Sequence, residues 1–322
     1  MKKVETYQVT QGPLDPSGTD RWTEATLYLG VLAAYYVTKD PQYLTDATTW
    51  SSKNKYALLT TTAADYADNW TAGQVYTELY LLDPTANASD ITASKAAVDA
   101  VTASPPTLLW YWCDALFMAP GLVVRLGAAD ATSGGATYYS FLDNEWTQTY
   151  TVLYDPTQKL FWRDATTKAN TPTTYWSRGN GWVMAGTARV LEYLPQTDVQ
   201  RSAYVTLLQN MASAVAPLQG SDGLWRSNLL DANAFPNPET SGTGLMTFAM
   251  AWGINNGVLD GPTYRPVVDK AWSGLVANVN SAGMLQYVQA AGSAPAAAKQ
   301  SDTFDYGVGA FLLAASEVAK LP

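Results

Sequence analysis

The sequence contains no histidine among its 322 residues and only one cysteine, Cys113. Without histidine there is no Ser-His-Asp triad, Cys-His dyad, HExxH zinc site or histidine general base. A single cysteine also excludes internal disulfides and thiolate metal clusters. If the protein is an enzyme, carboxylate, tyrosine or arginine side chains, or a bound cofactor, must carry the chemistry.

Positive charge is also scarce: 19 Lys and Arg stand against 28 Asp and Glu, giving a net charge of −9 and a pI of about 4.5. We expect no nucleic-acid partner, because few basic side chains are available to neutralise phosphates. No apolar run reaches the length of about 18 residues that a membrane span needs, so none is expected. The N-terminal segment lacks the apolar core of a signal peptide. The protein is therefore expected to be cytoplasmic, or secreted after removal of a leader.

Apolar and aromatic residues are plentiful, at 47% hydrophobic with 12 Trp and 20 Tyr. No low-complexity linker divides the chain, so residues 1–322 are expected to form one domain with a large core. Core packing is the ordinary role of Trp. Several Trp residues, however, stand beside Gly, Asn, Arg or Asp, and indole rings stack well on the C–H faces of sugars. A carbohydrate ligand is therefore favoured.

Two kinds of helix alternate along the chain. Helices rich in Gly, Ala and aromatics, expected to be buried on most sides, are predicted at Trp22–Tyr36, Asp68–Leu82, Asp114–Leu126, Asn180–Leu194, Ser241–Asn255 and Tyr306–Val318. Amphipathic helices of the outer type are predicted at Pro41–Tyr56, Ala88–Ala103, Ala136–Thr151, Val199–Val215 and Pro262–Asn280. This alternation predicts an all-α fold, an (α/α)6 toroid. The alternative is an open α-solenoid, whose terminal repeats should be polar caps, whereas the last helix is apolar.

A closed ring needs a twelfth helix, which should precede Trp22. Residues 1–21 are few and contain Pro13, Pro16 and Gly18. We therefore expect this edge to be frayed or closed by irregular chain. Only two short extended segments are predicted, at 157–164 and 223–227.

The segment Trp110–Pro120 places Asp114 at the start of an apolar helix, behind three aromatic residues. The helix dipole favours the ionised carboxylate there, whereas dry aromatic surroundings favour the neutral acid. Such opposed effects suit proton transfer near neutral pH. The alternative is that Asp114 is only a helix N-cap.

In such a ring the inner helices run in one direction, so the loops that lead into them open on one face. Five of these loops carry carboxylates, arginine or aromatics: Ala67–Trp70, Trp112–Asp114, Tyr175–Trp182, Pro238–Gly242 and Asp302–Gly307. Each could separately be a cap. Their gathering on one face predicts a functional cleft.

Within this cleft Arg178 is the candidate to grip a carboxylate bidentately, beside Trp176 and Trp182. The alternative for Arg178 is a structural link between two loops, and Asn180 could be only a helix cap. Further candidates for the sugar-binding wall and rim are Trp70, Trp112, Trp225 and Arg163. Exposed loop positions are the alternative for Arg163 and Arg226, and Glu239 receives no role.

The segments Trp112-Cys-Asp-Ala-Leu-Phe-Met-Ala-Pro120 and Trp176-Ser-Arg-Gly-Asn-Gly-Trp182 resemble the unsaturated uronyl hydrolases of glycoside hydrolase family 105, relatives of family 88. The similarity runs from near Trp22 to the closing Tyr306–Ala314. The resemblance implies an (α/α)6 barrel, which agrees with the helix pattern. Neither a metal nor another cofactor is expected.

The resemblance also implies a mechanism and its residues. The substrate is an oligosaccharide ending in a 4,5-unsaturated uronic acid left by a polysaccharide lyase. An Asp protonates C4, water adds at C5, and the product opens to release a keto-uronate. The family's main acid/base matches Asp114, and a second Asp, five residues before a Gly, matches Asp68. Its contacts to the sugar acid match the aromatic and Arg positions at 176, 178 and 182.

One departure concerns a His that many members carry near a Leu-Phe-aromatic sequence. This chain has Leu160-Phe-Trp-Arg163 there, so a binding role for Arg163 is expected, and both galacturonyl and glucuronyl substrates stay open. Aglycone and oligomeric state are also open.

Three rival functions are compatible with parts of the pattern. An inverting glycosidase could use Asp68 and Asp114, since such pairs lie about 6.5–9.5 Å apart; it would turn over saturated uronides. A barrel-type epimerase usually needs histidine bases, and their absence from this sequence counts against it. The third is a non-catalytic carbohydrate-binding protein, which would keep the aromatic residues without working acids. Unchanged activity in Asp114→Asn would remove the catalytic assignment of that residue.

Overall fold

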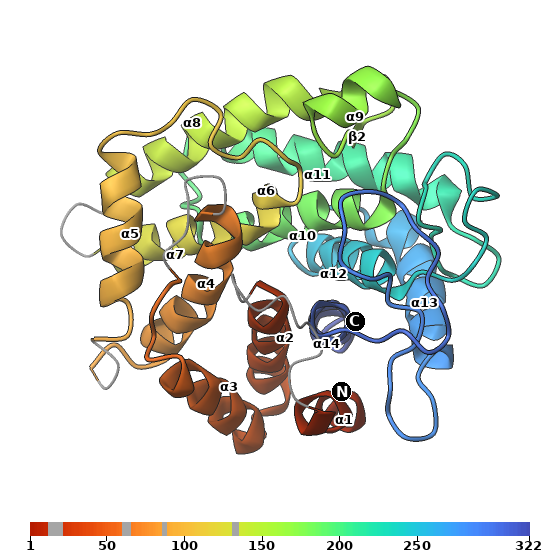
Figure 1. Ribbon diagram of the computed structural model, residues 1–322, viewed down its shortest axis with the longest axis horizontal. Coiled ribbons are helices and arrows are strands. Elements are labelled where there is room, and N and C mark those ends of the chain that lie inside the picture. The colour runs from red at the N-terminus through yellow and green to blue at the C-terminus, as the bar shows by residue number, and fades with distance from the viewer. Residues whose placement is uncertain (12–21, 60–65, 86–88, 131–134) are drawn as a thin grey trace.

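The computed structural model describes residues 1–11, 22–59, 66–85, 89–130 and 135–322. An inner ring consists of α2 (Trp22–Thr38), α4 (Tyr66–Leu82), α6 (Ala115–Met118) with α7 (Pro120–Ala129), α10 (Ser177–Tyr193), α12 (Thr240–Asn255) and α14 (Asp305–Val318). Each packs on the next, and α14 packs on α2, so the ring closes (Figure 1). Closure excludes the open solenoid.

An outer layer surrounds this ring. It consists of α1 (Lys2–Gln11), α3 (Pro41–Lys53), α5 (Thr92–Thr102), α8 (Ala136–Leu153), α11 (Arg201–Val215) and α13 (Gly261–Ala277). The outer helices bury only one stripe each, whereas α12 and α14 are buried along almost their whole length. The predicted (α/α)6 architecture is confirmed. The predicted start of the second outer helix, Ala88, lies outside the described residues.

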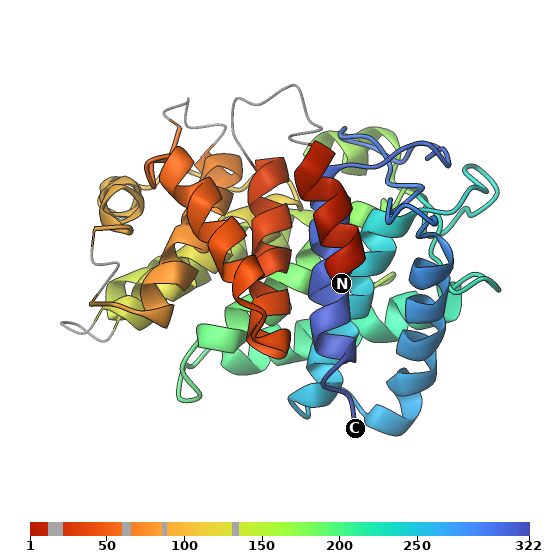
Figure 2. The same cartoon turned by 90° about the horizontal axis from the view of Figure 1, so that it is seen from below.

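The expectation of an irregular edge was wrong, because α1 supplies the twelfth helix. It lies against α14 (Figure 2), and the side chain of Gln8 donates a hydrogen bond of 2.7 Å to the carboxylate of Asp305. Glu5 is also buried. Polar contacts rather than an apolar stripe hold this helix in place, which is why the pattern did not reveal it. Pro13, Pro16 and Gly18 lie outside the described residues.

One of the two segments predicted to be extended contains a paired strand. Strands β1 (Tyr154–Asp155) and β2 (Leu160–Phe161) form an antiparallel hairpin, followed by the short helix α9 (Ala165–Asn170). Residues 223–227 are described and form no strand; the neighbouring Asn228 makes an isolated bridge with Trp176. A 3-10 turn, η2 (Ala216–Leu218), follows α11.

The third inner helix, predicted as continuous, is broken between α6 and α7. Pro120 has no N–H and interrupts the helical ladder. Gln74 on α4 compensates, because its amide donates to the carbonyls of Phe117 and Met118 at 2.9 and 2.8 Å. Gly121 makes room for it, since a Cβ there would lie 2.0 Å from the Gln74 side-chain oxygen. The break ends the single turn that follows Asp114.

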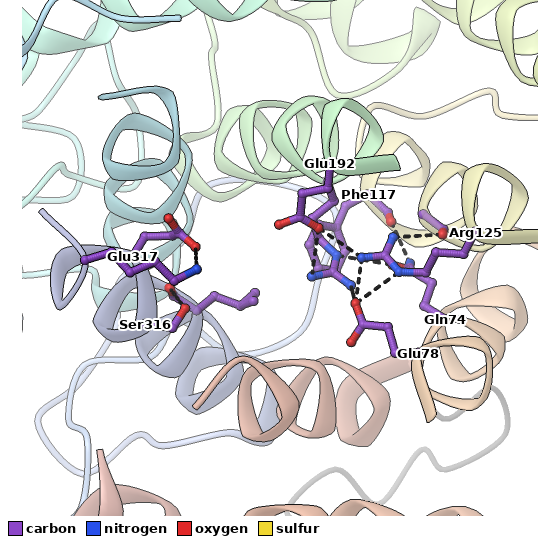
Figure 3. Close-up of polar contacts among 11 residues, drawn as sticks. Gln74, Glu78, Phe117, Arg125, Glu192, Ser316 and Glu317 are labelled. Atoms are coloured by element: carbon purple, nitrogen blue, oxygen red, sulfur yellow. Dashed lines mark hydrogen bonds and ion pairs between the residues drawn. The ribbon is translucent and has the colours of Figure 1, made fainter. Parts of the chain in front are cut away.

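A buried ionic network lies beside Gln74 (Figure 3). Glu78 on α4 accepts hydrogen bonds from Arg125 on α7, at 3.0 and 2.6 Å, and from Arg189 on α10, at 2.7 Å. Glu192 pairs with Arg125 at 3.1 Å. The two arginines hold the pKa of Glu78 below its usual value despite full burial. The network joins three inner helices that surround the broken turn.

Candidate active site

A pocket of about 190 Å³ opens where several inner helices begin. Its described lining consists of Trp22, Asp68, Trp112, Asp114, Met118, Arg163, Trp176, Arg178, Trp182 and Gly292. The predicted residues 68, 112, 114, 163, 176, 178 and 182 are therefore brought together. Two acids and two arginines face a mainly tryptophan wall.

Asp114 stands at the N-cap position of α6, but within the described chain its carboxylate accepts no capping bond from that helix. The residue is 8% exposed. Its Oδ2 lies 3.8 Å from Nε of Arg163 and 3.5 Å from Sγ of Cys113. Burial raises the pKa of the Asp114 carboxyl, and the charges of Arg163 and Arg178 oppose that rise only in part. The geometry favours an acid facing a pocket over a helix cap.

Arg163 is held at the pocket by its own neighbours. Its Nη1 donates to Asp164 at 2.7 Å, and Asp164 in turn caps α9 by accepting from the Thr167 amide at 2.7 Å. The Arg163 carbonyl accepts from the Cys113 amide at 2.8 Å. Its Nε is buried and, among the described residues, has no hydrogen-bond acceptor. That nitrogen is therefore an unsatisfied donor of a residue that lines the pocket.

Asn180 lies outside the pocket, which corrects its prediction as a substrate contact. Its side-chain oxygen accepts from the Phe161 amide at 2.7 Å, and its amide donates to the Phe161 carbonyl at 3.1 Å. It thereby joins α10 to β2, two residues before Arg163. Asn180 is fully buried, so its role is to fix the loop that carries Arg163.

Arg178 lies between two aromatic rings, 4.5 Å from the Trp176 centroid and 5.0 Å from that of Tyr306. Its terminal nitrogens donate to the carbonyls of Gln289 and, at 3.0 Å, Ala290. Within the part of the chain that is described, its buried Nε has no acceptor. Arg178 thus ties the loop after α13 to α10 and keeps one N–H group without an acceptor in the described chain.

Three lining residues were not predicted: Trp22, Met118 and Gly292. Trp22 packs edge-on against Trp182 at 6.3 Å and lies 5.0 Å from the Tyr306 ring. An aromatic at the start of the first inner helix was the available signal. The position of Gly292 had no signal, because it depends on how a long loop folds back.

Trp70 and Trp225 were predicted as sugar contacts, and the structure places both in the core instead. Trp70 is 1% exposed and packs against Tyr66 and Phe141. Trp225 is fully buried, and its Nε1 donates to the Val215 carbonyl at 2.7 Å.

The loop leading into α12 holds that helix against α10, although none of its residues belongs to the described pocket lining. Glu239 caps α12 by accepting from the amides of Ser241 and Gly242 at 2.9 and 2.7 Å, and it also accepts from the Ser177 hydroxyl. It is completely buried. Glu239 therefore fixes the start of α12 against the start of α10.

Across the described ranges, no three His, Cys, Asp or Glu side chains gather closely enough to hold a metal ion. No helix in those same ranges combines the length and apolar character needed to cross a bilayer.

Comparison with known proteins gives a consistent result. A family model described as Glycosyl Hydrolase Family 88 matches residues 1–322. The chain is 36% identical over 326 residues to an unsaturated 3S-rhamnoglycuronyl hydrolase of Formosa agariphila, covering 93% of this chain and 84% of that relative. A solved structure described as glycosyl hydrolase family 88 from Bacteroides vulgatus has a TM-score of 0.89 and 30% identity, over 98% and 96% of the two chains. Another, described as a polysaccharide lyase, has a TM-score of 0.89 and 31% identity, over 98% and 94%.

Proposed function

The chain belongs to glycosyl hydrolase family 88, and on that premise we propose how its pocket removes a terminal 4,5-unsaturated uronic acid from an oligosaccharide. The protein is a glycoside hydrolase. The observation that carries the assignment of residues is the position of Asp114, a buried acid that caps nothing in the described part of α6 and faces two arginines. A vinyl ether needs an acid that is protonated when it meets the substrate.

The proposed reaction is a hydration followed by ring opening. Protonated Asp114 gives its proton to C4, and positive charge develops at C5, where the ring oxygen shares it. Water adds to C5 and returns one proton to the Asp114 carboxylate. The resulting C5 hemiketal opens to a ketone, and the C1 hemiacetal so formed releases the remaining saccharide as an alcohol. No net proton or electron is consumed beyond the added water.

The substrate's carboxylate is assigned to the two arginines. Nε–H of Arg163 and Nε–H of Arg178 are buried donors without acceptors in the described chain, and an unsatisfied buried donor is costly unless a ligand pairs with it. Charge-assisted bonds to a carboxylate are the stronger kind. The tryptophans supply flat apolar surface for the sugar ring.

Asp68 is assigned the second carboxylate role. It lies in the first turn of α4 and lines the same pocket as Asp114. In the proposal it orients the water that attacks C5. Its loss should lower kcat more than it raises KM, because the interaction is made chiefly as the water attacks.

The activity test follows the ultraviolet absorbance of the unsaturated uronide over a panel of lyase products with glucuronyl and galacturonyl ends. A hydrolase of this kind removes the absorbance, whereas a lyase would create it from a saturated polymer. Saturated uronides should be inert; turnover comparable to that of the unsaturated sugar would instead indicate an inverting glycosidase.

The residue test compares Asp114→Asn with Asp269→Asn, a matched change on the outer helix α13, where Asp269 pairs with Arg265. Loss of a general acid typically costs about 10²–10⁴-fold in rate, and the outer variant should match the wild type. Full activity of Asp114→Asn would remove the assignment.

A further inference from the structure

The charged and titratable side chains around Asp114 come from four parts of the chain. Asp68 lies on α4, Arg163 and its partner Asp164 precede α9, Arg178 lies on α10, and Cys113 is adjacent in sequence. The other described walls, including Trp22 and Gly292, carry no charge. Because Arg163 and Asp164 form a close pair, Arg163 is poised between two acids.

The contact between Arg163 and Asp114 is incomplete. The separation of 3.8 Å from Nε to Oδ2 is an ion pair but too long for a hydrogen bond. By contrast, the contact of Arg163 with Asp164 is 2.7 Å. Arg163 is thus anchored by Asp164, while its Nε–H has no hydrogen-bond acceptor among the described residues.

We propose that Arg163 is a positioning residue that couples binding of the substrate's carboxylate to protonation of Asp114. The inference rests on the proposed function and deepens it. In the free enzyme the Arg163 charge favours the ionised form of Asp114. When the substrate's carboxylate pairs with Arg163, that charge is neutralised and a new negative charge lies beside Asp114. Both changes favour the protonated acid, which is the form that the first step needs.

The direction of this effect follows from electrostatics. An opposite charge within about 4–6 Å lowers the pKa of a carboxyl by about 1–3 units. Burial raises the pKa of Asp114, and the charges of Arg163 and then Arg178 oppose it. When the substrate's carboxylate neutralises the Arg163 charge, less positive charge opposes the effect of burial, and the pKa of Asp114 rises. Binding of the substrate therefore favours the protonated form of Asp114 that the first step requires.

The coupling predicts that the pH profiles of kcat and of kcat/KM differ in position. The pH dependence of kcat/KM reports groups of the free enzyme, and that of kcat reports groups of the complex. A general acid loses activity as pH rises through its pKa, so both profiles have an alkaline limb. In the wild type the kcat limb should lie at higher pH than the kcat/KM limb.

The experiment measures both profiles for wild type, R163Q and R226Q on an unsaturated uronide. R226Q is the matched control, since Arg226 also follows a Trp but pairs with Asp222 away from the pocket. In R163Q the kcat/KM limb should move up by about one pH unit and approach the kcat limb, while KM rises. R226Q should keep the wild-type separation.

A second measurement needs no turnover. The carboxyl infrared band assigned to Asp114, by difference from Asp114→Asn, is titrated in free wild type and free R163Q. The titration midpoint should be higher in R163Q; an unchanged or lower midpoint overturns the coupling. The coupling is also overturned if the alkaline limbs of the kcat and kcat/KM profiles of the wild type lie at the same pH. Absence of turnover on every unsaturated uronide would instead count against the proposed function, and the infrared result would still decide the coupling.

Discussion

The amide of Gln74 donates a 2.8 Å hydrogen bond to the Met118 carbonyl, one position before the helix break. Its second bond, to the Phe117 carbonyl, satisfies another backbone acceptor beside the break. A side chain from α4 thus completes the turn that carries Asp114. The acid's position depends on a contact between segments more than 40 residues apart in sequence.

Gln74→Leu should therefore lower both stability and activity. Unsatisfied buried carbonyls cost about 1–3 kcal/mol each, and a shifted turn misplaces Asp114. We expect lower kcat at temperatures where the variant is still folded. Gln196→Leu, at an exposed position, is the control. Wild-type kcat in a destabilised Gln74→Leu would show that the bond supports folding alone.

Glu78→Gln tests the ionic network of Figure 3. It leaves Arg125 and Arg189 as buried charges without a full counter-charge, and breaking such a pair typically costs about 3–5 kcal/mol. Chemical denaturation should show this loss. Asp269→Asn on α13 removes an exposed pair and should cost about 1 kcal/mol or less; equal losses in the two variants would contradict the structural role of the network.

Glu5 makes the docking of α1 pH-dependent. Burial, and then the neighbouring Asp46, raise the pKa of Glu5 to about 7. Since this exceeds the unfolded value, its contribution to stability is full below about pH 4.5 and is lost as pH rises to about 7. Glu5→Gln stays neutral, so it should melt higher than wild type at pH 8, by about 2–4 °C per kcal/mol gained. Near pH 4.5 the two proteins should have the same melting temperature, and a difference there would argue against the titration of Glu5 as the cause.

Gly292 should control the size of the pocket without affecting folding. Among the described residues, a Cβ built on Gly292 meets the Ala290 carbonyl oxygen alone, 4.0 Å away, and Gly292 is exposed on a pocket wall. Gly292→Leu should raise KM for the oligosaccharide while the melting temperature stays at the wild-type value. Gly257→Leu would not be a fair control, because Gly257 has φ +68° and a side chain there would be strained. Ala291→Leu, directly before Gly292 in the same exposed loop, is a better control. Unchanged KM in Gly292→Leu would place the substrate elsewhere.

Sequence patterns predicted the ring and its alternating layers because inner and outer helices differ in how much of their surface is apolar. They also identified Asp114, Arg178, Trp176 and Trp182, since these residues cluster at helix starts and within recognisable motifs. Helix α1 was missed, because its anchors are polar contacts such as that of Gln8 with Asp305.

The sequence by itself determined the fold class and the absence of histidine chemistry, and it indicated the acid that we propose acts in its place. Only the tertiary structure decided which neighbours that acid has. Trp70, Asn180 and Trp225 turn into the core while Trp22 and Gly292 line the pocket, because the direction of a side chain is set by packing between helices that are distant in sequence. The same packing brings Arg163 within reach of Asp114.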